Sequence, residues 1–471
     1  MTERSQVRDL REKSIGALML KYYFPAFAGV VVNSLYNIVD RIFIGQGVGS
    51  LALAGLSIIF PIMVIFMAFG MLVGAGAAVR ISINLGRKDV ARAERVLGNA
   101  VFLALSLGIL MTATGFLIRK PILYFFGAGE ETFSYALEYL DIILFGVPLG
   151  MLGYSLNNMI RSEGNPRIAM FSMFISAGLN IILDPIFIFY LDMGVRGAAL
   201  ATVISQAVLC IWVVGHFISR RSVVRLRVPN LKPVREIIIY IVTIGFASFS
   251  MQIAASLVHG LFAKQLIVHG GDIAVGAMGI INSVSMMLVM AIIALNMASQ
   301  PIIGFNYGAR NYDRVLKTVS LGIRAATLIA IGGWILAMVV PGQIVGLFNS
   351  DDQQLRIIGV RGLRIFAALL PFVGFQIIAS NLFQSVGKAK LATLLSLLRQ
   401  VIYLIPLLMI LPQFFGLTGV WLSMPVSDFL ASITSFIFLR REILSLSKRR
   451  GKCVKRDKFS PEPVPLLPFE H

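Results

Sequence analysis

Long apolar segments separated by short polar turns make up most of this chain. Many of these segments exceed about 18 residues, which is enough for a helix to cross about 30 Å of hydrocarbon. Residues 54–79, for example, carry no charge at all. The pattern predicts an all-α membrane protein with twelve transmembrane helices. Their expected ranges are 15–44, 51–83, 95–118, 132–160, 166–191, 195–219, 236–268, 273–305, 313–340, 355–385, 389–411 and 416–440.

The composition excludes several other classes of protein. Of the 471 residues, 57% are hydrophobic and only 14% are charged, whereas soluble domains carry about 25% charged residues. A porin-type barrel is excluded because its alternating strands would not give uninterrupted apolar runs. The net charge of +19 does not indicate nucleic-acid binding, because the basic residues lie between the apolar segments.

Basic residues alternate between the two sides of the predicted membrane protein. They crowd the N-terminal segment, the even-numbered turns, the connector 220–235 and the C-terminal segment, and they are scarce in the odd-numbered turns. Because basic loops stay on the cytoplasmic side, we expect both termini in the cytoplasm. The sequence therefore predicts a multi-pass protein of the cell inner (plasma) membrane.

The two halves of the chain repeat at an offset of about 222 residues. The run Leu85-Gly86-Arg87-Lys88-Asp89 after span 2 matches Tyr307-Gly308-Ala309-Arg310-Asn311 after span 8. Each half has an even number of spans, so we expect parallel repeats related by an axis along the membrane normal. The predicted units are an N-terminal six-helix bundle (1–219), a cytoplasmic connector (220–235), a C-terminal six-helix bundle (236–440) and a basic, Pro-rich cytoplasmic tail (441–471).

Two acidic residues lie inside apolar spans of the first half, Asp40 in span 1 and Asp184 in span 5. A carboxylate at membrane depth costs about 3 kcal/mol or more unless it is neutralised. The repeat places Phe262 and Ile405 at the matching positions of the second half. The ordinary interpretation is two unrelated polar residues that stabilise helices. The similar depth of the two acids and their absence from the other half favour a functional site.

Other polar side chains are expected near these acids. Asn180 lies one turn before Asp184, and Thr202 follows on span 6. At 1.5 Å per residue, Asp40, Asp184 and Thr202 fall about 8–11 Å below the outer surface. Two carboxylates, an amide and a hydroxyl suit a hard cation or a proton shared between acids. Span 1 also carries a polar stripe of Asn33, Tyr36 and Asn37, and span 4 places Tyr139 at the same depth.

Four further charged residues lie within predicted spans, in addition to the two acids above. Glu138 and Asp141, beside Tyr139, face either the site or the lipid headgroups, and the sequence leaves this open. Arg399 on span 11 and Asp428 on span 12 both fall near the membrane midplane. We expect a structural ion pair between them, because an unpaired charge there would be costly.

These features together resemble the multidrug and toxic compound extrusion (MATE) family, in its prokaryotic branch, over all twelve spans. The resemblance rests on the two six-span halves, Asp40 with Pro25 upstream, the Asn180-x3-Asp184-Pro185 pattern, Thr202 and the run after span 2. It implies cation-coupled efflux through a V-shaped cleft between the two bundles. It also implies that Asp40, Asn180, Asp184 and Thr202 bind the coupling ion, that span 1 bends at Pro25, and that Tyr139 and Asn157 are polar cavity positions.

We therefore expect a secondary active antiporter that exports amphipathic, often cationic drugs in exchange for H+ or Na+ by alternating access. Its expected partners are a small-molecule substrate and membrane lipid. It is expected to be a monomer with no nucleic-acid partner and no cofactor beyond the coupling ion. The alternative is a flippase or exporter of a lipid-linked saccharide or other amphipathic metabolite, which should show several cationic residues along the cleft. An enzyme is not expected, because no assignable catalytic spacing is visible.

Overall fold

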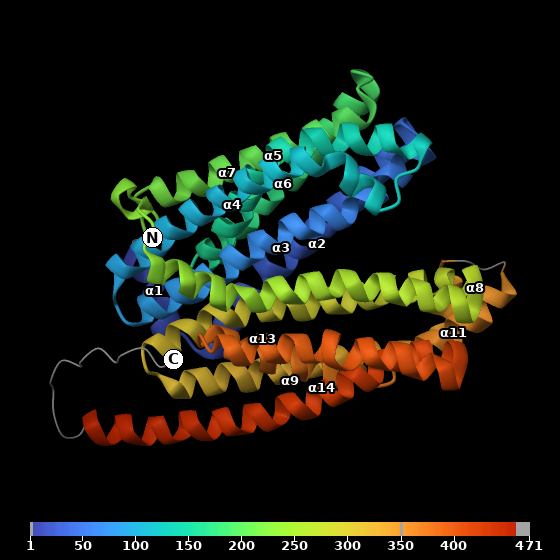
Figure 1. The fold of residues 1–471 in the computed structure, drawn as a ribbon. Coiled ribbons are helices and arrows are strands. Elements are labelled where there is room, and N and C mark those ends of the chain that lie inside the picture. Colours follow the sequence, from blue (N-terminus) through green and yellow to red (C-terminus); the bar gives the residue numbers. More distant parts are fainter. Residues whose placement is uncertain (1–2, 349–351, 458–471) are drawn as a thin grey trace.

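The computed structural model describes residues 3–348 and 352–457, and every element in these ranges is a helix (Figure 1). The main helices of the first half are α1 (Glu3–Glu12), α2 (Ile15–Gly47), α3 (Ser50–Gly86), α4 (Val90–Phe125), α5 (Glu130–Ser162), α6 (Pro166–Pro185), the π-helical turn η1 (Ile186–Tyr190) and α7 (Gly194–Ile218). The remaining helices are η2 (Val228–Leu231), α8 (Arg235–Gly308), α9 (Tyr312–Val339), α10 (Pro341–Gly346), α11 (Gln353–Ala367), α12 (Leu370–Ser385), α13 (Ala389–Leu397), the π-helical η3 (Leu398–Leu404) and α14 (Ile405–Asp457).

Two of the long helical segments each contain two membrane spans. The described residues hold nine segments that are long and apolar enough to cross a membrane. The chain leaves helical geometry at Gly271 in α8 (φ 64°) and at Gly416 in α14 (φ 55°), a conformation that glycine adopts without a Cβ clash. Figure 1 shows the chain reversing direction within α8. When these halves are counted separately and α11 with α12 as one span, the prediction of twelve spans is confirmed.

Span 10 is broken, although the sequence pattern predicted one continuous helix over 355–385. Helices α11 and α12 meet at an angle of 45°. Pro371 lies at the start of α12, and its ring has no N–H to donate to the carbonyl of Ala367. A proline at this position is a sufficient cause for the kink.

The expected cytoplasmic tail is partly helical. Helix α14 continues past the last predicted span to Asp457. Residues 441–457 therefore continue the helix of span 12. The Pro-rich end of the predicted tail, residues 458–471, lies outside the described residues.

The two halves of the chain form two groups of helices that diverge from one end. In Figure 1 the first half (blue to green) and the second half (yellow-green to red) meet at the left, where α1 lies, and separate toward the right. We call the left end the α1 end and the right end the open end. This arrangement confirms the expected V shape. The connector between the halves is bound to the first half, because the backbone N–H of Val234 donates to Asn99 Oδ1 at 2.6 Å.

Glycines bring α3 and α8 into close contact near the α1 end. A Cβ added to Gly86 would lie under 3.0 Å from the backbone carbonyl of Phe305, and one added to Gly308 would lie under 3.0 Å from that of Ile83. The contact is reciprocal, because Gly308 is the repeat counterpart of Gly86 and Phe305 is the repeat counterpart of Ile83, at the offset of about 222 residues. A reciprocal contact of this kind requires an axis of approximate two-fold symmetry between the halves.

The turns that follow spans 2 and 8 also share one conformation. Lys88 and Arg310 are both left-handed, with φ of 64° and 58°. Each is followed by an N-cap residue: Asp89 accepts from the N–H of Arg92, and Asn311 accepts from that of Arg314. The matching runs read from the sequence therefore fold into matching turns.

Helix α1 binds both halves at the α1 end. On the first-half side, Asn165 Nδ2 donates to Gln6 Oε1 at 3.0 Å. On the second-half side, Arg314 Nη2 donates to the carbonyl oxygens of Leu10 at 3.1 Å and Lys13 at 2.6 Å. Leu10 itself is fully buried. This helix is therefore a bridge across the closed end of the V.

We predict that Gly86→Ala weakens the contact between the halves. Its Cβ must displace backbone, and overpacking of this kind costs about 1–3 kcal/mol. Thermal unfolding in detergent should show a lower Tm than wild type. Gly332→Ala is the matched control, since nothing lies within 4 Å of a Cβ added there. Equal Tm values for both variants would contradict the close packing of α3 on α8.

Candidate functional site

Three helices of the first half bring the predicted acidic residues together. Asp40 lies on α2, Asn180 and Asp184 lie on α6, and Thr202 lies on α7. Asn180 and Asp184 share one face of α6 because they are four residues apart. All four side chains are buried, and Asp184 has no exposed surface. The structure thus gathers into one cluster four residues that are separated by up to 162 positions in the sequence.

Hydrogen bonds organise this cluster around Asn180. Its Nδ2 donates to Asp184 Oδ1 at 3.3 Å and, at 3.5 Å, to Thr202 Oγ1. The carboxyl groups of Asp40 and Asp184 lie close enough to influence each other electrostatically. Two ionised carboxylates this close repel each other strongly in a medium of low dielectric constant.

Three oxygens of the cluster have no partner. Asp40 Oδ1, Asn180 Oδ1 and Asp184 Oδ2 are buried, and none of them accepts a hydrogen bond in the described part of the chain. Neither carboxylate has a basic side chain within salt-bridge distance there. Buried polar atoms are normally paired, so unpaired oxygens in one place mark a site suited to a proton or a cation with oxygen ligands.

Two tyrosines lie beside the acids. Tyr139 on α5 is buried and lies close to Thr202. Tyr36 on α2 lies close to Asp40. The other polar residues of α2 face differently, since Asn37 is exposed and its Nδ2 donates to the backbone carbonyl of Asn33 at 2.6 Å.

The acidic neighbours of Tyr139 pair with basic residues and not with the cluster. Glu138 accepts from Arg196 at 3.1 Å, and Asp141 accepts from Arg119 at 2.6 Å. Both pairs are partly exposed. The structure therefore decides a question that the sequence left open.

Asn157 lies away from the acid cluster. Its Nδ2 donates to the carbonyl of Ala169 at 2.8 Å and to Ser172 Oγ at 2.7 Å. Ser172 precedes Asp184 on α6 by 12 residues, or about 18 Å. Because depth along a helix follows residue count, Asn157 belongs to the α1 end of the bundle.

Two prolines interrupt the backbone hydrogen bonds of the site helices. Pro25 lies within α2, which runs unbroken from Ile15 to Gly47 in this structure. Pro185 ends α6, and the π-helical turn η1 follows it directly. Such π-helical turns often occur at functional sites.

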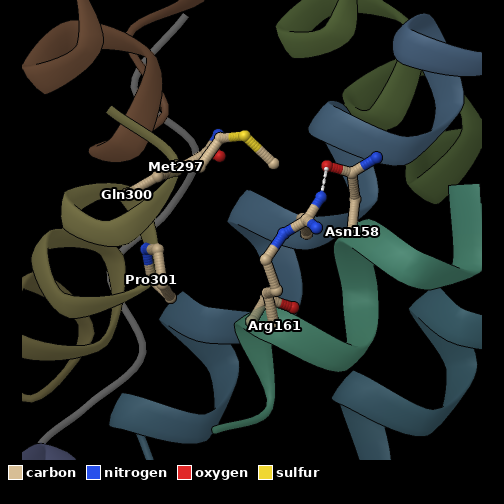
Figure 2. Close-up of a pocket in the computed structure, with 7 residues that line it drawn as sticks. Asn158, Arg161, Met297, Gln300 and Pro301 are labelled. Atoms are coloured by element: carbon tan, nitrogen blue, oxygen red, sulfur yellow. Dashed lines mark hydrogen bonds between the residues drawn. The ribbon is translucent and has the colours of Figure 1, made fainter. Parts of the chain in front are cut away.

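A small cavity between the halves holds a buried arginine. Figure 2 shows Arg161 and Asn158 of α5 facing Met297, Gln300 and Pro301 of α8 across this cavity, whose volume is about 10 Å³, room for about one water. Arg161 Nη2 donates to Asn158 Oδ1 at 2.7 Å. No carboxylate lies within salt-bridge distance of Arg161 among the described residues. In the sequence, Arg161 is one of the basic residues beside an even-numbered turn, and nothing in the pattern marks it as a cavity residue.

A second polar cluster at the α1 end was also missed. Glu163 is fully buried and contacts His216 Nε2. Its other oxygen accepts from Ser222 Oγ at 2.6 Å and from the backbone N–H of Val223 at 3.1 Å. These contacts fix the start of the connector. Glu163 follows the last turn of α5, where the sequence offered only a local turn pattern.

The geometry defines a polytopic membrane transporter built from two repeated bundles, with a buried acid cluster in the first. A family model described as MatE matches residues 25–186 and 244–410. These matches cover well over half of the chain and fall once in each half. The chain therefore belongs to the MATE family of transporters, as the resemblance indicated.

Relatives and solved structures cover nearly the whole chain. Multidrug export protein MepA of Staphylococcus aureus (strain N315) is 29% identical over 430 residues, which are 91% of this chain and 94% of the relative. A multidrug resistance MATE family transporter in an outward-facing conformation has a TM-score of 0.87 at 27% identity, covering 94% and 98% of the two chains. A MATE protein in a bent conformation gives 0.89 at 27% identity with the same coverage.

A further similar structure is a MOP superfamily transporter from Pyrococcus furiosus. It has a TM-score of 0.86 at 26% identity and covers 93% of this chain and 98% of its own. That protein is described as having a reversed polarity of its binding pocket, which suggests a different function for it. The shared fold therefore leaves the cargo of this chain to be argued from its own residues.

We predict opposite stability effects at the two buried acids Asp184 and Asp428. Asp184→Asn should keep or raise the Tm, because its carboxylate has no cationic partner to lose. Asp428→Asn leaves the largely covered guanidinium of Arg399 without its carboxylate, and the loss should approach the roughly 3–5 kcal/mol that is typical of breaking a buried pair. Thermal unfolding at neutral pH checks both variants. A fall for Asp184→Asn as large as that for Asp428→Asn would show that the acid cluster is a stabilising structural feature.

Proposed function

We propose that this chain is a secondary active antiporter that exports amphipathic, often cationic compounds in exchange for H+ or Na+. The observation that carries the proposal is the buried pair of Asp40 and Asp184, which has no cationic partner in the described structure. A pair of this kind needs a mobile positive charge. The relatives named multidrug export proteins support drugs as the class of cargo.

The coupling ion would bind among the oxygens of the acid cluster. Asp40, Asp184, Asn180 and Thr202 supply carboxylate, amide and hydroxyl oxygens, which suit a proton shared between the acids or a Na+ ion. A positive charge between the carboxylates removes their repulsion. Moving one charge through 100 mV provides about 2.3 kcal/mol, enough for about fifty-fold accumulation of cargo.

Alternating access would use the contacts at the α1 end. The basic turns place this end in the cytoplasm, so the described arrangement would open to the outside of the inner (plasma) membrane. The close contact of Gly86 with Gly308 and the bridge through Arg314 would then separate when the molecule opens inward. A bend in α2 at Pro25 would accompany the change. We expect the transporter to work as a monomer.

We predict that Asp40→Asn and Asp184→Asn each abolish coupled export. The neutral amide of Asn lacks the negative charge that binds the ion. Cargo release therefore loses its driving force. Efflux of a fluorescent lipophilic cation from cells, with external Na+ and pH varied separately, measures the effect and also identifies the ion.

Glu138→Gln is the matched control for this assay. It removes an acidic charge from α5 that pairs with Arg196 near the open end, and export should stay at the wild-type level. Gel filtration must show that the Asn variants are folded. Unchanged export by both folded Asn variants would remove this mechanism.

We also predict that Arg314→Gln increases the population of molecules in which the α1 end is open. The change removes hydrogen bonds to α1 worth about 1 kcal/mol, which corresponds to roughly a fivefold shift in population. A Met297→Cys probe, in a chain with Cys210→Ser and Cys453→Ser, reports this through its reaction with a membrane-impermeant maleimide applied to inside-out vesicles.

Arg92→Gln provides the comparison for this measurement. Arg92 is the repeat counterpart of Arg314, and its Nε pairs locally with Asp89 Oδ2 at 3.8 Å. We expect its labelling rate to match that of the parent. Equal rates for both Gln variants would show that α1 does not hold the two halves together.

The alternative cargo is an anionic amphiphile, such as a lipid-linked saccharide or another amphipathic metabolite. Arg161 favours it, because this buried cation lines the cavity between the halves and has no carboxylate partner among the described residues. The same efflux assay with a fluorescent anionic lipid separates the two cargo classes. Export of the anion but not of the cation would support the alternative.

A further inference from the structure

The two bundles differ in what fills the position of the acid cluster. The repeat relates Asp40 to Phe262 and Thr202 to Met424 at an offset of 222. Phe262, Ile405 and Met424 all belong to one hydrophobic cluster of the second half. The equivalent helices therefore bring the equivalent positions together, but with apolar side chains in place of the two acids and the threonine of the first half.

A charged pair of the second half, Arg399 and Asp428, lies on spans 11 and 12, farther from the open end than the acid cluster of the first half. Arg399 is in the π-helical η3 of span 11, and Asp428 is on α14 in span 12. Asp428 is 12 residues from the turn at Gly416, or about 18 Å along the helix, whereas Thr202 is about 12 Å from the corresponding turn. The pair therefore lies about 6 Å closer to the α1 end than the acid cluster.

The second-half carboxylate is neutralised within the chain. Arg399 Nε donates to Asp428 Oδ1 at 2.5 Å, and Asp428 is only 6% exposed. Ser427 Oγ also donates to the backbone carbonyl of Arg399 at 2.6 Å, which fixes η3 against α14. In the described part of the second half, the other buried charged side chain is Glu442, which pairs with Lys388 at 2.5 Å.

An arginine side chain is a counterion that does not readily exchange for a proton or a metal ion. Its guanidinium keeps its charge at any pH that the protein meets, and a hydrogen bond between two charged groups is strong. A proton or Na+ that displaced Arg399 from Asp428 would leave a guanidinium that is only 17% exposed without its carboxylate, which is unfavourable. The pair therefore cannot take up and release a cation in a transport cycle.

We propose that Arg399 is a built-in counterion that permanently occupies Asp428, so that the second half contributes no exchangeable cation and coupling is confined to the acid cluster of the first half. This inference rests on the proposed function, because it assigns the ion traffic of that antiporter to one half. It accounts for the difference between the two bundles. Both carry buried acids, but Asp428 is neutralised by a side chain of the protein itself, whereas the acid cluster has no such partner among the described residues.

Reaction with dicyclohexylcarbodiimide tests the proposal on the wild-type protein in liposomes. A protonated carboxyl adds across a C=N bond of the reagent and rearranges to a stable N-acylurea, so the peptide gains the whole reagent and releases nothing. At mildly acidic pH, we expect labelling at Asp40 or Asp184 and none at Asp428, as read by peptide mass spectrometry. Labelling of Asp428 within a few-fold of the rate at Asp184 would overturn the proposal.

Variants of the counterion sharpen this test. Arg399→Gln should raise labelling of Asp428 at least tenfold, while Arg399→Lys, which keeps a tethered cation, should leave it protected. No increase in folded Arg399→Gln would show that burial alone protects Asp428 and would overturn the role of Arg399. If Arg399→Gln does not fold, the comparison of sites in the wild-type chain still decides.

A transport measurement provides an independent arm. The double variant Arg399→Gln with Asp428→Asn carries no charge at this position, and it should export the fluorescent cation within about twofold of the wild-type rate with the same ion dependence. Loss of ion dependence in the folded double variant would show that the pair takes part in coupling. Failure of both Asp40 and Asp184 to react with carbodiimide, with Asp428 protected, would instead count against the proposed first-half ion site.

Discussion

A pair of buried carboxylates that forms no salt bridge within the described part of the chain is the constraint on which the rest of this structure depends. Packing of α2, α6 and α7 brings Asp40 and Asp184 within reach of each other and leaves three oxygens of the cluster unpaired. Such an arrangement is unfavourable in a membrane protein unless a positive charge arrives from outside the chain. This is the physical reason for proposing that a mobile cation binds in the first bundle.

The same framework is used twice with different interiors. The symmetric contact of Gly86 and Gly308 depends on backbone approach, so it needs equivalent residues in both halves. The interior of each bundle is free of that requirement. The first half uses this freedom for the acid cluster. The second half fills the corresponding place with the hydrophobic cluster that contains Phe262, and its buried carboxylate Asp428 pairs with Arg399.

Contacts at the α1 end are numerous and individually weak. Helix α1 joins both halves through hydrogen bonds of Gln6 and of Arg314, and Glu163 holds the connector against the first half. Each hydrogen bond contributes about 1 kcal/mol. A set of this kind can keep one end closed in one state and still be broken by the free energy of a single transported charge.

The sequence by itself determined the spans, the repeat and the core of the candidate site. Hydropathy marks spans because each backbone must satisfy its own hydrogen bonds in lipid, and helical spacing puts Asn180 and Asp184 on one face without knowledge of any partner. Only the tertiary structure decided that Asn157 lies far from the acids, that Arg161 lines a cavity, that Glu138 pairs with Arg196 and that α1 bridges the halves. These features depend on which residues, distant in the sequence, meet when helices pack, and the period of a helix carries no information about its partner.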